Sequence, residues 1–421
     1  MTEQAKVPAI RFAGFTDPWE QRKFGDCFEF LKSNTLSRAG LNGENGTARN
    51  VHYGDILIKF GDCLDGERSD LPFITDDTVL PKYAGSILRE GDVIFADTAE
   101  DETAGKCVEL RKLPKEPTIS GLHTIPARPR FPFGTGYLGH YLNSDAYHRQ
   151  LLPLMQGIKV ISVSKAALQD TQVRFPGLSE QSAIGAALNE IDSLITLHQR
   201  KYDKLVIFKK SMLEKMFPKD GESVPEIRFA GFTDPWEQRQ LGELVTTTIG
   251  GGTPSTSNPA YWDGEIPWIQ SSNVLEDTLF DVDIPKAITQ KGLEESVAQI
   301  VPENSIAVVT HVGVGKLIYL PFQYSTSQDF ISLCGLKGDA RYTCYALWKR
   351  LQEDLHIVQG SAIKGITKED LLEKNLPMPS VEEQAQIGVL FSQLDNLITL
   401  HQRKLELLQN IKKSLLDKMF V

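Results

Sequence analysis

The sequence predicts a mixed α/β (α+β) fold with an internal pseudo-two-fold duplication, in which two unlike bodies are joined by two long antiparallel coiled-coil helices. Three observations lead to this prediction. The dodecapeptide RFAGFTDPWEQR occurs twice, at Arg11–Arg22 and Arg228–Arg239, and a heptad-patterned segment also occurs twice. Between these repeats, the chain alternates short apolar runs with turns. A repeat unit of about 200 residues indicates one duplication rather than a solenoid of small units.

The repeated segments form a common frame around two bodies whose sequences barely match. We call Arg11–Arg22 and Arg228–Arg239 the first and second frame peptides. The first body covers residues of about 24–155, and the second covers about 241–358. A duplicated frame that holds two unlike inserts suggests two copies of one task with different targets.

The frame peptides are expected to serve the frame itself. Trp19 and Trp236 each follow Asp-Pro and are predicted to pack the frame onto its body. By symmetry, the N-terminal PAIRFAG should lie beside the end of the second long helix, near Phe420. Binding of one shared partner by both frame peptides is the rival explanation for their identity.

The two matching C-terminal segments predict long helices. Glu180–Phe217 matches Glu383–Phe420 at roughly half its positions, and both contain LITLHQRK. Apolar residues recur at alternating steps of four and three, which is the pattern of a coiled-coil seam. Some 36 residues would give a rod of roughly 55 Å. Each helix is too amphipathic to stand alone, so we expect the two to pack against each other, antiparallel.

Two histidines and two lysines interrupt this apolar seam. His198, His401, Lys209 and Lys412 are interpreted as polar residues that set the helix register. The alternative for the histidines is a pH switch or a metal pair. The expected residues of the helix–helix seam are Leu188, Ile191, Ile195, His198, Phe391, Leu394, Ile398 and His401.

The predicted domain organisation follows the repeat. The expected segments are a first domain at 1–178, a first long helix at 179–218, a second domain at 219–380 and a second long helix at 381–421. Ser380 and Glu383 predict a capping box at the second helix start.

Each body is predicted to contain a sheet and short helices. Runs rich in Val, Ile and aromatic residues, bounded by Gly-Asp or Pro, are typical of strands. Those runs are YGDILIKFGD, GDVIFADT, GKCVELRK and GLHTIPARP in the first body, and EIPWIQSS, SIAVVTHV, KLIYLPF and FISLCGL in the second. SDAYHRQLLPLM and ARYTCYALWKRLQEDL predict helices.

Composition limits the class of protein. The chain has 421 residues and a net charge of −10, and a strongly basic footprint is the usual sign of a dedicated nucleic-acid binder. No apolar run reaches the roughly 18–20 residues that span a bilayer. The N-terminus lacks the apolar core of a signal peptide, so a cytoplasmic location is expected. Five scattered cysteines without a CxxC pair indicate reduced structural thiols and no metal site.

The motifs that suggest an enzyme are incomplete. HVGVGK at His311–Lys316 would need Gly at Thr310 and Ser or Thr at Leu317 to form a phosphate loop. NPAY at Asn258–Tyr261 lacks the second proline of the motif that holds a flipped base in amino-methyltransferases. The acidic loop DTAEDE could bind a metal, but the favoured interpretation is a solvated turn. We identify no catalytic centre in the sequence.

Polar loops in both bodies instead predict a surface that reads DNA. Glycines let backbone amides approach phosphates, while Ser, Asn and Gln side chains suit base edges. The candidate DNA-binding residues are Arg49, Asn50, His52, Lys59, Arg128, Arg130, Thr253, Ser255, Thr256, Gln270, Ser271, Ser272, Asn273, Thr310, Lys316, Gln328 and Lys364.

The whole chain resembles the specificity subunits of bacterial type I restriction–modification enzymes. The resemblance is carried by IRFAGFTDPWEQR, by NVHYGDILIKFG and GDVIFADTAEDETAGK, by GGTPSTSNPAYWDGEIPW, and by LPMPSVEEQAQIG leading into LITLHQRK. Gly177 stands where the second copy has the helix-capping Ser380, which predicts a slightly looser start to the first helix.

This resemblance implies two target-recognition domains, each of which reads one half of a bipartite double-stranded DNA site. It implies that the helices set the gap between half-sites and bind two methyltransferase subunits, and that the complex also recruits two restriction subunits. S-adenosylmethionine, ATP and Mg would be used by those partners, with no cofactor in this chain. A partner-completed clamp would also reconcile DNA binding with the acidic net charge.

Two other functions remain open on the sequence. One is a duplicated coiled-coil interaction scaffold without DNA binding. The other is a self-sufficient nuclease or methyltransferase, which the incomplete motifs disfavour. Salt-dependent binding to a split DNA sequence separates the first alternative from the leading hypothesis, and cofactor turnover by the purified chain would support the second.

Overall fold

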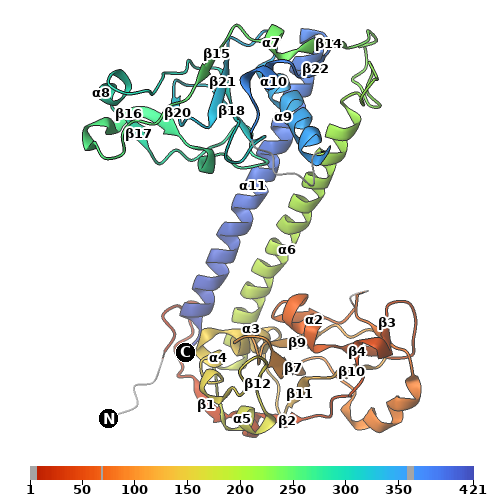
Figure 1. The fold of residues 1–421 in the computed structure, drawn as a ribbon. Coiled ribbons are helices and arrows are strands. Elements are labelled where there is room, and N and C mark those ends of the chain that lie inside the picture. Colours follow the sequence, from red (N-terminus) through yellow and green to blue (C-terminus); the bar gives the residue numbers. More distant parts are fainter. Residues whose placement is uncertain (1–6, 68–69, 358–364) are drawn as a thin grey trace. The chain divides into compact units, whose positions relative to one another are not determined.

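The computed structural model describes residues 7–67, 70–357 and 365–421. The chain divides into two compact units: Met1–Gln199 with Arg403–Val421, and Arg200–Gln402. The division falls inside both long helices, α6 (Leu178–Lys215) and α11 (Val381–Met419) (Figure 1). Each unit therefore contains one body, one frame peptide and part of each long helix. The helix bounds lie close to the expected 179–218 and 381–421.

The first unit contains two main sheets. The five-stranded sheet has the order β2-β11-β7-β9-β5, and the four-stranded sheet has the order β10-β4-β6-β3. The strands are β1 (Glu20–Lys23), β2 (Phe28–Phe30), β3 (Leu41–Asn42), β4 (Arg49–Val51), β5 (Cys63–Asp65), β6 (Phe73–Ile74), β7 (Val93–Ala96), β8 (Thr98–Ala99), β9 (Cys107–Arg111), β10 (Thr118–Ser120), β11 (Thr124–Pro129), β12 (Ile161–Ser162) and β13 (Gln172–Phe175). The short helices are α1 (Phe24–Cys27), α2 (Tyr53–Ile58), α3 (Tyr137–Asn143), α4 (Asp145–His148) and α5 (Lys165–Asp170).

The second unit contains a four-stranded sheet of order β15-β21-β18-β19 and a three-stranded sheet of order β17-β16-β20. Its strands are β14 (Glu237–Gln240), β15 (Thr247–Gly250), β16 (Trp262–Ile269), β17 (Ala287–Ile288), β18 (Ser305–Val309), β19 (Leu317–Leu320), β20 (Ser325–Thr326), β21 (Phe330–Cys334) and β22 (Asn375–Met378). Its helices, besides α6 and α11, are α7 (Leu241–Leu244), α8 (Gln290–Glu294), α9 (Ala340–Ile357) and α10 (Lys368–Leu372).

The two bodies share one sheet frame despite their unlike sequences. In each unit, four antiparallel strands are ordered first, fourth, second and third along the chain: β2-β11-β7-β9 and β15-β21-β18-β19. The first unit adds β5, which runs parallel to β9. Strand pairing thus constrains the two bodies alike, although their side chains differ.

One predicted strand is wrong. YGDILIKFGD does not form a strand, because Tyr53–Ile58 is the helix α2. His52 caps this helix, since its Nδ1 accepts a hydrogen bond from the Gly54 amide at 3.2 Å. Ile56 is fully buried and Ile58 is 85% exposed, so alternate apolar residues do face opposite ways. The cap and helix geometry override the strand preference of the isoleucines. The other predicted strands and the helix α9 are confirmed.

Each frame peptide ends in a strand that pairs with the strand before a long helix, and we call this strand pair the clasp. β1 pairs with β13 and β14 pairs with β22, both antiparallel. In the first unit, the Ile10 amide donates to the Lys418 carbonyl at 3.0 Å, so PAIRFAG lies beside the end of α11 as predicted. In the second unit, the Ile227 amide donates to the Lys215 carbonyl at 2.9 Å. The same connections are therefore made twice.

The frame arginines hold the helix starts. Arg11 forms two hydrogen bonds to the Glu180 carboxylate, at 2.8 and 2.6 Å. Arg228 forms the same pair to Glu383, at 2.7 and 2.8 Å. The predicted capping box is half present, because the Ser380 hydroxyl accepts from the Glu383 amide but the Glu383 carboxylate turns to Arg228 instead.

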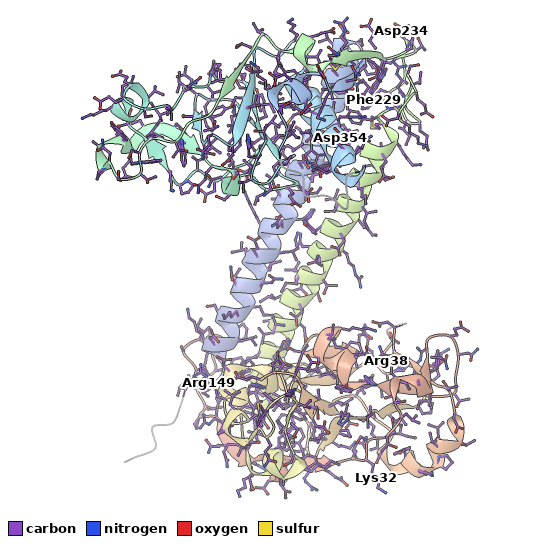
Figure 2. The ribbon with its side chains drawn as sticks, viewed as in Figure 1. Lys32, Arg38, Arg149, Phe229, Asp234 and Asp354 are labelled. Atoms are coloured by element: carbon purple, nitrogen blue, oxygen red, sulfur yellow. The ribbon has the colours of Figure 1, made fainter. Side chains whose placement is uncertain are left out.

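The frame tryptophans pack onto their bodies, as predicted. Trp19 meets Tyr137 edge-on at 6.2 Å, and Trp236 meets Tyr342 edge-on at 5.9 Å. These rings join the main hydrophobic core of each unit. Figure 2 draws the side chains on the ribbon and labels Phe229 and Asp234 of the second frame peptide.

The long helices contribute to both cores. In the first unit, Leu188 of α6 is fully buried in the same cluster as Met419 and Phe420. In the second, Leu213 of α6 and Phe391 of α11 share a cluster. Among the expected seam residues, Leu394 is also buried, while Ile191, Ile195, His198, Ile398 and His401 are partly exposed. Among the described residues, no helix has the length and apolar character needed to cross a membrane.

The cysteines are free thiols, in accordance with the predicted reduced state. Cys27, Cys107, Cys334 and Cys344 are buried and Cys63 is partly exposed. Burial raises the pKa of the Cys27 thiol to about 11, so this thiol stays protonated near neutral pH.

Candidate nucleic-acid interface

In the second body, polar loops that are far apart in sequence meet at one edge. The Thr253 hydroxyl donates to Gln328 Oε1 at 2.5 Å. The turn after β16 is closed by a hydrogen bond from the Gln270 amide to Asn273 Oδ1 at 2.9 Å. The Ser327 amide donates to the Ile269 carbonyl at 2.8 Å and ties this turn to the strand end that carries Gln328. The edge therefore gathers hydroxyl and amide side chains suited to base edges.

Glycines and tryptophans explain how the loop Gly250–Trp262 reaches this edge. A Cβ on Gly251 would lie 1.8 Å from the Ser327 carbonyl oxygen, so only glycine fits there. The Trp268 indole donates to the Gly252 carbonyl at 3.1 Å, and the Trp262 indole donates to the Ser255 carbonyl at 3.1 Å. The two indole rings are perpendicular, with centroids 5.1 Å apart. The two indoles hold the polar loop in place through these hydrogen bonds to its backbone.

The predicted residues of this edge differ in exposure. Ser255, Thr256, Ser272 and Gln328 are exposed. Thr253, Gln270, Ser271, Asn273 and Lys316 are partly exposed. Thr310 is fully buried, and its hydroxyl donates to the Asp329 carbonyl at 3.0 Å. Lys364 lies outside the described residues.

In the first body, several predicted residues are engaged by the fold. Arg49 donates to the Leu71 carbonyl at 2.8 Å, and its guanidinium carbon lies 3.7 Å above the Phe73 ring. Asn50 is fully buried. Arg128 forms two hydrogen bonds to Asp92, at 2.9 and 2.7 Å. Arg49 and Arg128 present few donors to a partner, because the fold already occupies them. The side-chain amide of Asn50 makes no hydrogen bond among the described residues, but its burial keeps it from the surface.

Other predicted residues of the first body lie near the capped start of α2 or further along it. His52 is 7% exposed. Burial, and then the nearby Arg38 guanidinium, lower the pKa of His52, which keeps its capping nitrogen free to accept. Lys59 pairs with Asp55 at 3.1 Å, and Arg38, labelled in Figure 2, also binds Asp55 at 2.6 Å. Arg130 lies away from α2: it directly follows Pro129, the last residue of β11, and is exposed.

Sequence reasoning missed two residues near His52. The Tyr53 ring lies beside the His52 ring at a tilt of 36°, with centroids 4.7 Å apart, and Tyr53 also meets His123 edge-on at 5.4 Å. His123 is separated from Tyr53 by 70 positions, and no local pattern singles it out. Only its position in the turn before β11, next to α2, reveals it.

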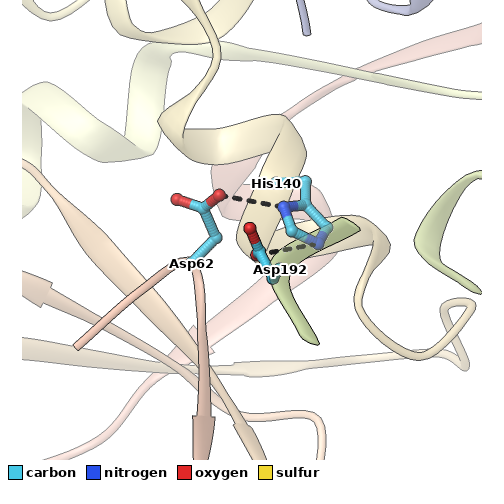
Figure 3. Close-up of side chains that lie close together, drawn as sticks. All are labelled: Asp62, His140 and Asp192. Carbon is cyan, nitrogen blue, oxygen red and sulfur yellow. Dashed lines mark hydrogen bonds and ion pairs between the residues drawn. The ribbon is translucent and has the colours of Figure 1, made fainter. Parts of the chain in front are cut away.

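A cluster of possible metal ligands lies at the junction of the first body with α6. The ligand atoms of Asp62, His140 and Asp192 lie within 4.8 Å of one another (Figure 3). His140 is fully buried; its Nδ1 lies 2.9 Å from Asp62 Oδ2, and its Nε2 lies 4.0 Å from Asp192 Oδ2. Carboxylate and imidazole together are common metal ligands.

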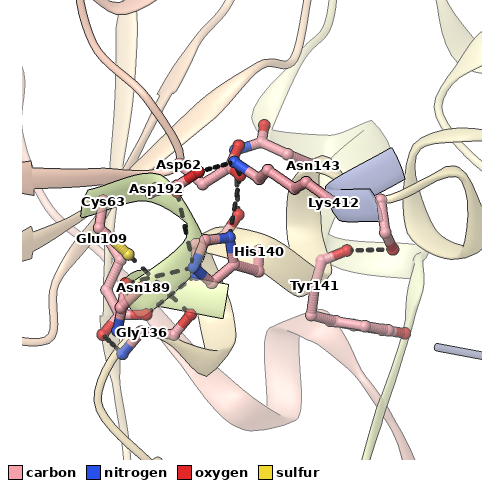
Figure 4. A network of polar contacts seen from close by, with 12 residues as sticks. Asp62, Cys63, Glu109, Gly136, His140, Tyr141, Asn143, Asn189, Asp192 and Lys412 are labelled. Carbon is pink, nitrogen blue, oxygen red and sulfur yellow. Dashed lines mark hydrogen bonds and ion pairs between the residues drawn. The ribbon is translucent and has the colours of Figure 1, made fainter. Parts of the chain in front are cut away.

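A lysine ammonium group already binds both carboxylates of this cluster. Lys412 Nζ lies 2.7 Å from Asp62 and 2.6 Å from Asp192, so it binds both carboxylates (Figure 4). His140 Nε2 also lies 3.2 Å from Asn189 Oδ1. We interpret the cluster as a buried ion network that fastens α11 to α6 and to the first body.

The second unit repeats this arrangement with different chemistry. Lys209 of α6 lies 2.5 Å from Asp395 of α11, and the Tyr345 hydroxyl donates to the same carboxylate at 2.5 Å. Lys209 Nζ also lies 5.7 Å from the centroid of the Tyr345 ring. Lysine and aspartate thus face each other across the helix pair in each unit, which supports the interpretation of both lysines as register-setting residues.

Part of the chain matches a known protein family. Residues 233–410 match the family described as the type I restriction modification DNA specificity domain. This match covers the second repeat from its frame peptide to most of α11.

Curated relatives extend the similarity. A Methanocaldococcus jannaschii protein named as the specificity subunit of the MjaX type I restriction enzyme is 23% identical over 417 residues, which cover 95% of this chain and 92% of that protein. The MjaIX specificity subunit of the same organism is 28% identical over 193 residues, or 44% of each chain. The EcoR124I/EcoR124II specificity subunit of Escherichia coli is 27% identical over 171 residues, or 38% of this chain and 41% of that protein.

A solved structure shares the fold along the entire chain. The S subunit of a type I restriction–modification system from M. genitalium superposes with a TM-score of 0.59. The alignment covers 99% of both chains at 14% sequence identity. The two mixed α/β bodies and paired long helices are therefore a known architecture.

Proposed function

We propose that this chain, which belongs to the family of type I restriction–modification specificity subunits, recognises a bipartite double-stranded DNA site and reads one half with each body. One observation carries the proposal. The same clasp and the same four-stranded order occur twice, yet the polar edges that they carry differ. A duplicated support with unlike contact residues suits two unlike half-sites.

The polar edge of the second body supports a base-reading role. Its hydroxyl and amide side chains can both donate and accept hydrogen bonds, as base edges in the major groove require. The carbonyl-bound indoles and close-packed glycines hold the loop in place, which reduces the ordering that DNA binding would otherwise need.

The long helices supply surfaces for partner subunits. Apolar side chains remain exposed along them, including Ile207 at 69%, Phe208 at 49%, Leu400 at 46% and Leu407 at 59%. Exposed apolar side chains such as these are available for contact with a protein partner. We assign these surfaces to two methyltransferase subunits, with two restriction subunits completing the complex.

The chemistry is assigned to those partners. Adenine methylation with S-adenosylmethionine, and translocation and cleavage with ATP and Mg, would belong to the methyltransferase and restriction subunits. The chain described here would select the DNA sequence and position the partners on it. Its net charge of −10 then requires the partners to supply part of the positive surface that encloses DNA.

The decisive experiment maps methylation in DNA from cells that express this chain with its methyltransferase subunit. We expect a new bipartite motif with a fixed gap and adenine methylation in each half. Purified complex should also bind that duplex with a strong dependence on salt. A stable complex that binds no split sequence and leaves no new methylation would instead identify an interaction scaffold.

A further inference from the structure

The two bodies correspond residue by residue at the end of their shared sheets. Ala96 of β7 pairs with Thr124 of β11, and Val309 of β18 pairs with Phe330 of β21. These are the last residues of β7 and β18 and the first residues of β11 and β21. The register of the strands is therefore the same at this edge in both bodies.

The correspondence continues into the turns beyond the strands. The Asp97 amide donates to the His123 carbonyl at 3.1 Å, and the Thr310 amide donates to the Asp329 carbonyl at 2.7 Å. Each bond joins the residue after the second strand to the residue before the fourth. His123 in the first body thus occupies the backbone position of Asp329 in the second.

A second strand pair extends the match to the capped turns. β4 runs parallel to β10, and β16 runs parallel to β20. The Gly121 amide donates to the Val51 carbonyl at 2.9 Å, as the Ser327 amide donates to the Ile269 carbonyl at 2.8 Å. Val51 and Ile269 each precede a short helix whose first residues face this edge. The turn NVHYGD therefore corresponds to WIQSSN.

This correspondence identifies side chains of the first body at the edge predicted to read DNA in the second. The matched pairs are His52 with Gln270, Tyr53 with Ser271, and His123 with Asp329. Among the described residues, the Tyr53 hydroxyl makes no hydrogen bond. The His123 side chain is 48% exposed, and its Nδ1 lies 3.4 Å from Asp97 Oδ1.

His123 is also held in an unusual backbone conformation. Its φ angle is +54°, in the left-handed region that few non-glycine residues adopt. Such strained positions cluster at binding sites, where the surrounding structure enforces them. The edge-on contact with Tyr53, at 5.4 Å and 74°, fixes the relative orientation of the two rings.

We infer that Tyr53 and His123 are the base-reading pair of the first body, a role that rests on the proposed DNA-recognition function. The phenol hydroxyl and the imidazole nitrogens can donate or accept hydrogen bonds at base edges. Their rings can also contact a thymine methyl group. Arg128 and Arg130 lie at the opposite end of the six-residue strand β11, about 20 Å away along the strand. They are therefore outside this reading edge.

The test uses the full-length chain in complex with its methyltransferase subunit, after the target has been mapped. Tyr53→Phe removes only the hydroxyl group. His123→Asn keeps a residue that tolerates left-handed backbone. The matched control is Arg149→Gln, which changes a 74% exposed arginine of the first body that is not a candidate DNA-binding residue. Melting temperature of each complex checks folding, and binding is measured on duplexes altered at single positions in either half-site.

We expect each reading-pair variant to lose discrimination at one or two positions of one half-site by about tenfold or more, with the other half-site unchanged. The Arg149→Gln variant should keep full discrimination. If both variants discriminate in both half-sites as the unaltered chain does, the pair does not read bases and the inference is wrong, while bipartite recognition itself stands. If the unaltered complex shows no bipartite preference, the proposed function fails first.

Discussion

Arg11 and Arg228 explain, at the scale of single residues, why the frame peptides recur without change. Each guanidinium binds a nearly buried glutamate at the start of a long helix, and each also donates to a carbonyl of its own peptide. The Glu180 side chain is 3% exposed and Arg11 is 11% exposed. A buried carboxylate that loses its arginine partner is destabilising, because water does not reach it to solvate the remaining charge.

Arg11→Ala should therefore destabilise the first unit by about 2–4 kcal/mol, because Glu180 is left buried without a counter-charge. Chemical denaturation measures the free energy of unfolding. Arg22→Ala is the matched control in the same peptide: Arg22 and its partner Glu20 are 48% and 59% exposed, so a loss below about 1 kcal/mol is expected. Equal losses for both variants would contradict the anchoring role of Arg11.

Asp62 adds a pH-dependent contribution to the stability of the first unit. Burial opposes ionisation of its carboxyl, but the hydrogen bond with His140 and the ammonium of Lys412 outweigh this and lower the pKa of Asp62 to about 2. A lowered folded-state pKa means that the stabilisation is complete above about pH 4, the unfolded value, and is lost as the pH falls toward 2.

Between pH 5 and pH 2, the unaltered chain should lose about 2 kcal/mol more stability than the Asp62→Asn variant, which cannot titrate at this site. The free energy of unfolding is measured across this pH range. Asp145→Asn is a suitable control, because the Asp145 side chain is 65% exposed. Parallel pH profiles for the unaltered chain and Asp62→Asn would show that the Asp62 network does not contribute.

At the scale of elements, α6 and α11 are matched by charge as well as by apolar packing. In the first unit, Lys412 of α11 meets Asp192 of α6, and in the second, Lys209 of α6 meets Asp395 of α11. A one-residue shift of either helix would separate these charges and leave them partly buried. The ion pairs therefore select one register among several that the heptad pattern alone would allow.

A double-mutant cycle on Lys209→Met and Asp395→Asn should give a coupling free energy of about 1–3 kcal/mol, because these two groups are in direct contact. Thermal or chemical unfolding of the four variants supplies the cycle. Lys210→Met with Asp395→Asn serves as the control cycle, since Lys210 is exposed and should couple weakly. Coupling of the same size in both cycles would argue against a specific Lys209–Asp395 interaction.

At the scale of the whole molecule, the duplication separates support from specificity. The frame peptides, the clasps and the Arg–Glu pairs at the helix starts are the same in both copies, whereas the polar edges differ. This separation means that the parts can be changed independently, so the two units should respond separately to edits.

Exchange of residues of about 24–155 for those of a relative with a different target should change one half of the methylated motif and leave the other half intact. Methylation mapping of cellular DNA provides the readout. The reciprocal exchange of about 241–358 controls for general damage, since it should change the opposite half. A change in both halves after a single exchange would contradict modular recognition.

Insertion of one heptad into both long helices, between Leu188 and Lys209 and at the matching positions of α11, should lengthen the gap in the motif. Seven residues add about 10 Å, or about three base pairs of B-DNA, and preserve the apolar face. The half-site sequences should remain unchanged. An unaltered gap with full activity would show that helix length does not set the spacing.

The frame peptides and the long helices could be predicted from the sequence, because the patterns that indicate them are local or repeated. Identity between Arg11–Arg22 and Arg228–Arg239 revealed the duplication, and heptad spacing predicted both long helices. The strand around Tyr53–Ile58 was predicted wrongly, since isoleucine content outweighed a cap that depends on the His52 ring.

The candidate site was less accessible to sequence reasoning, because the charge of a side chain says nothing of its partners. Arg49 and Arg128 looked available in the sequence, but the fold binds them to Leu71 and Asp92. By itself, the sequence determined the duplication, the long helices and the resemblance to type I specificity subunits, which depend on contiguous patterns. Only the tertiary structure brought His123 beside Tyr53, because strand pairing joins positions that no local pattern connects. Only the strand registers showed that these two residues correspond to residues at the polar edge of the second body.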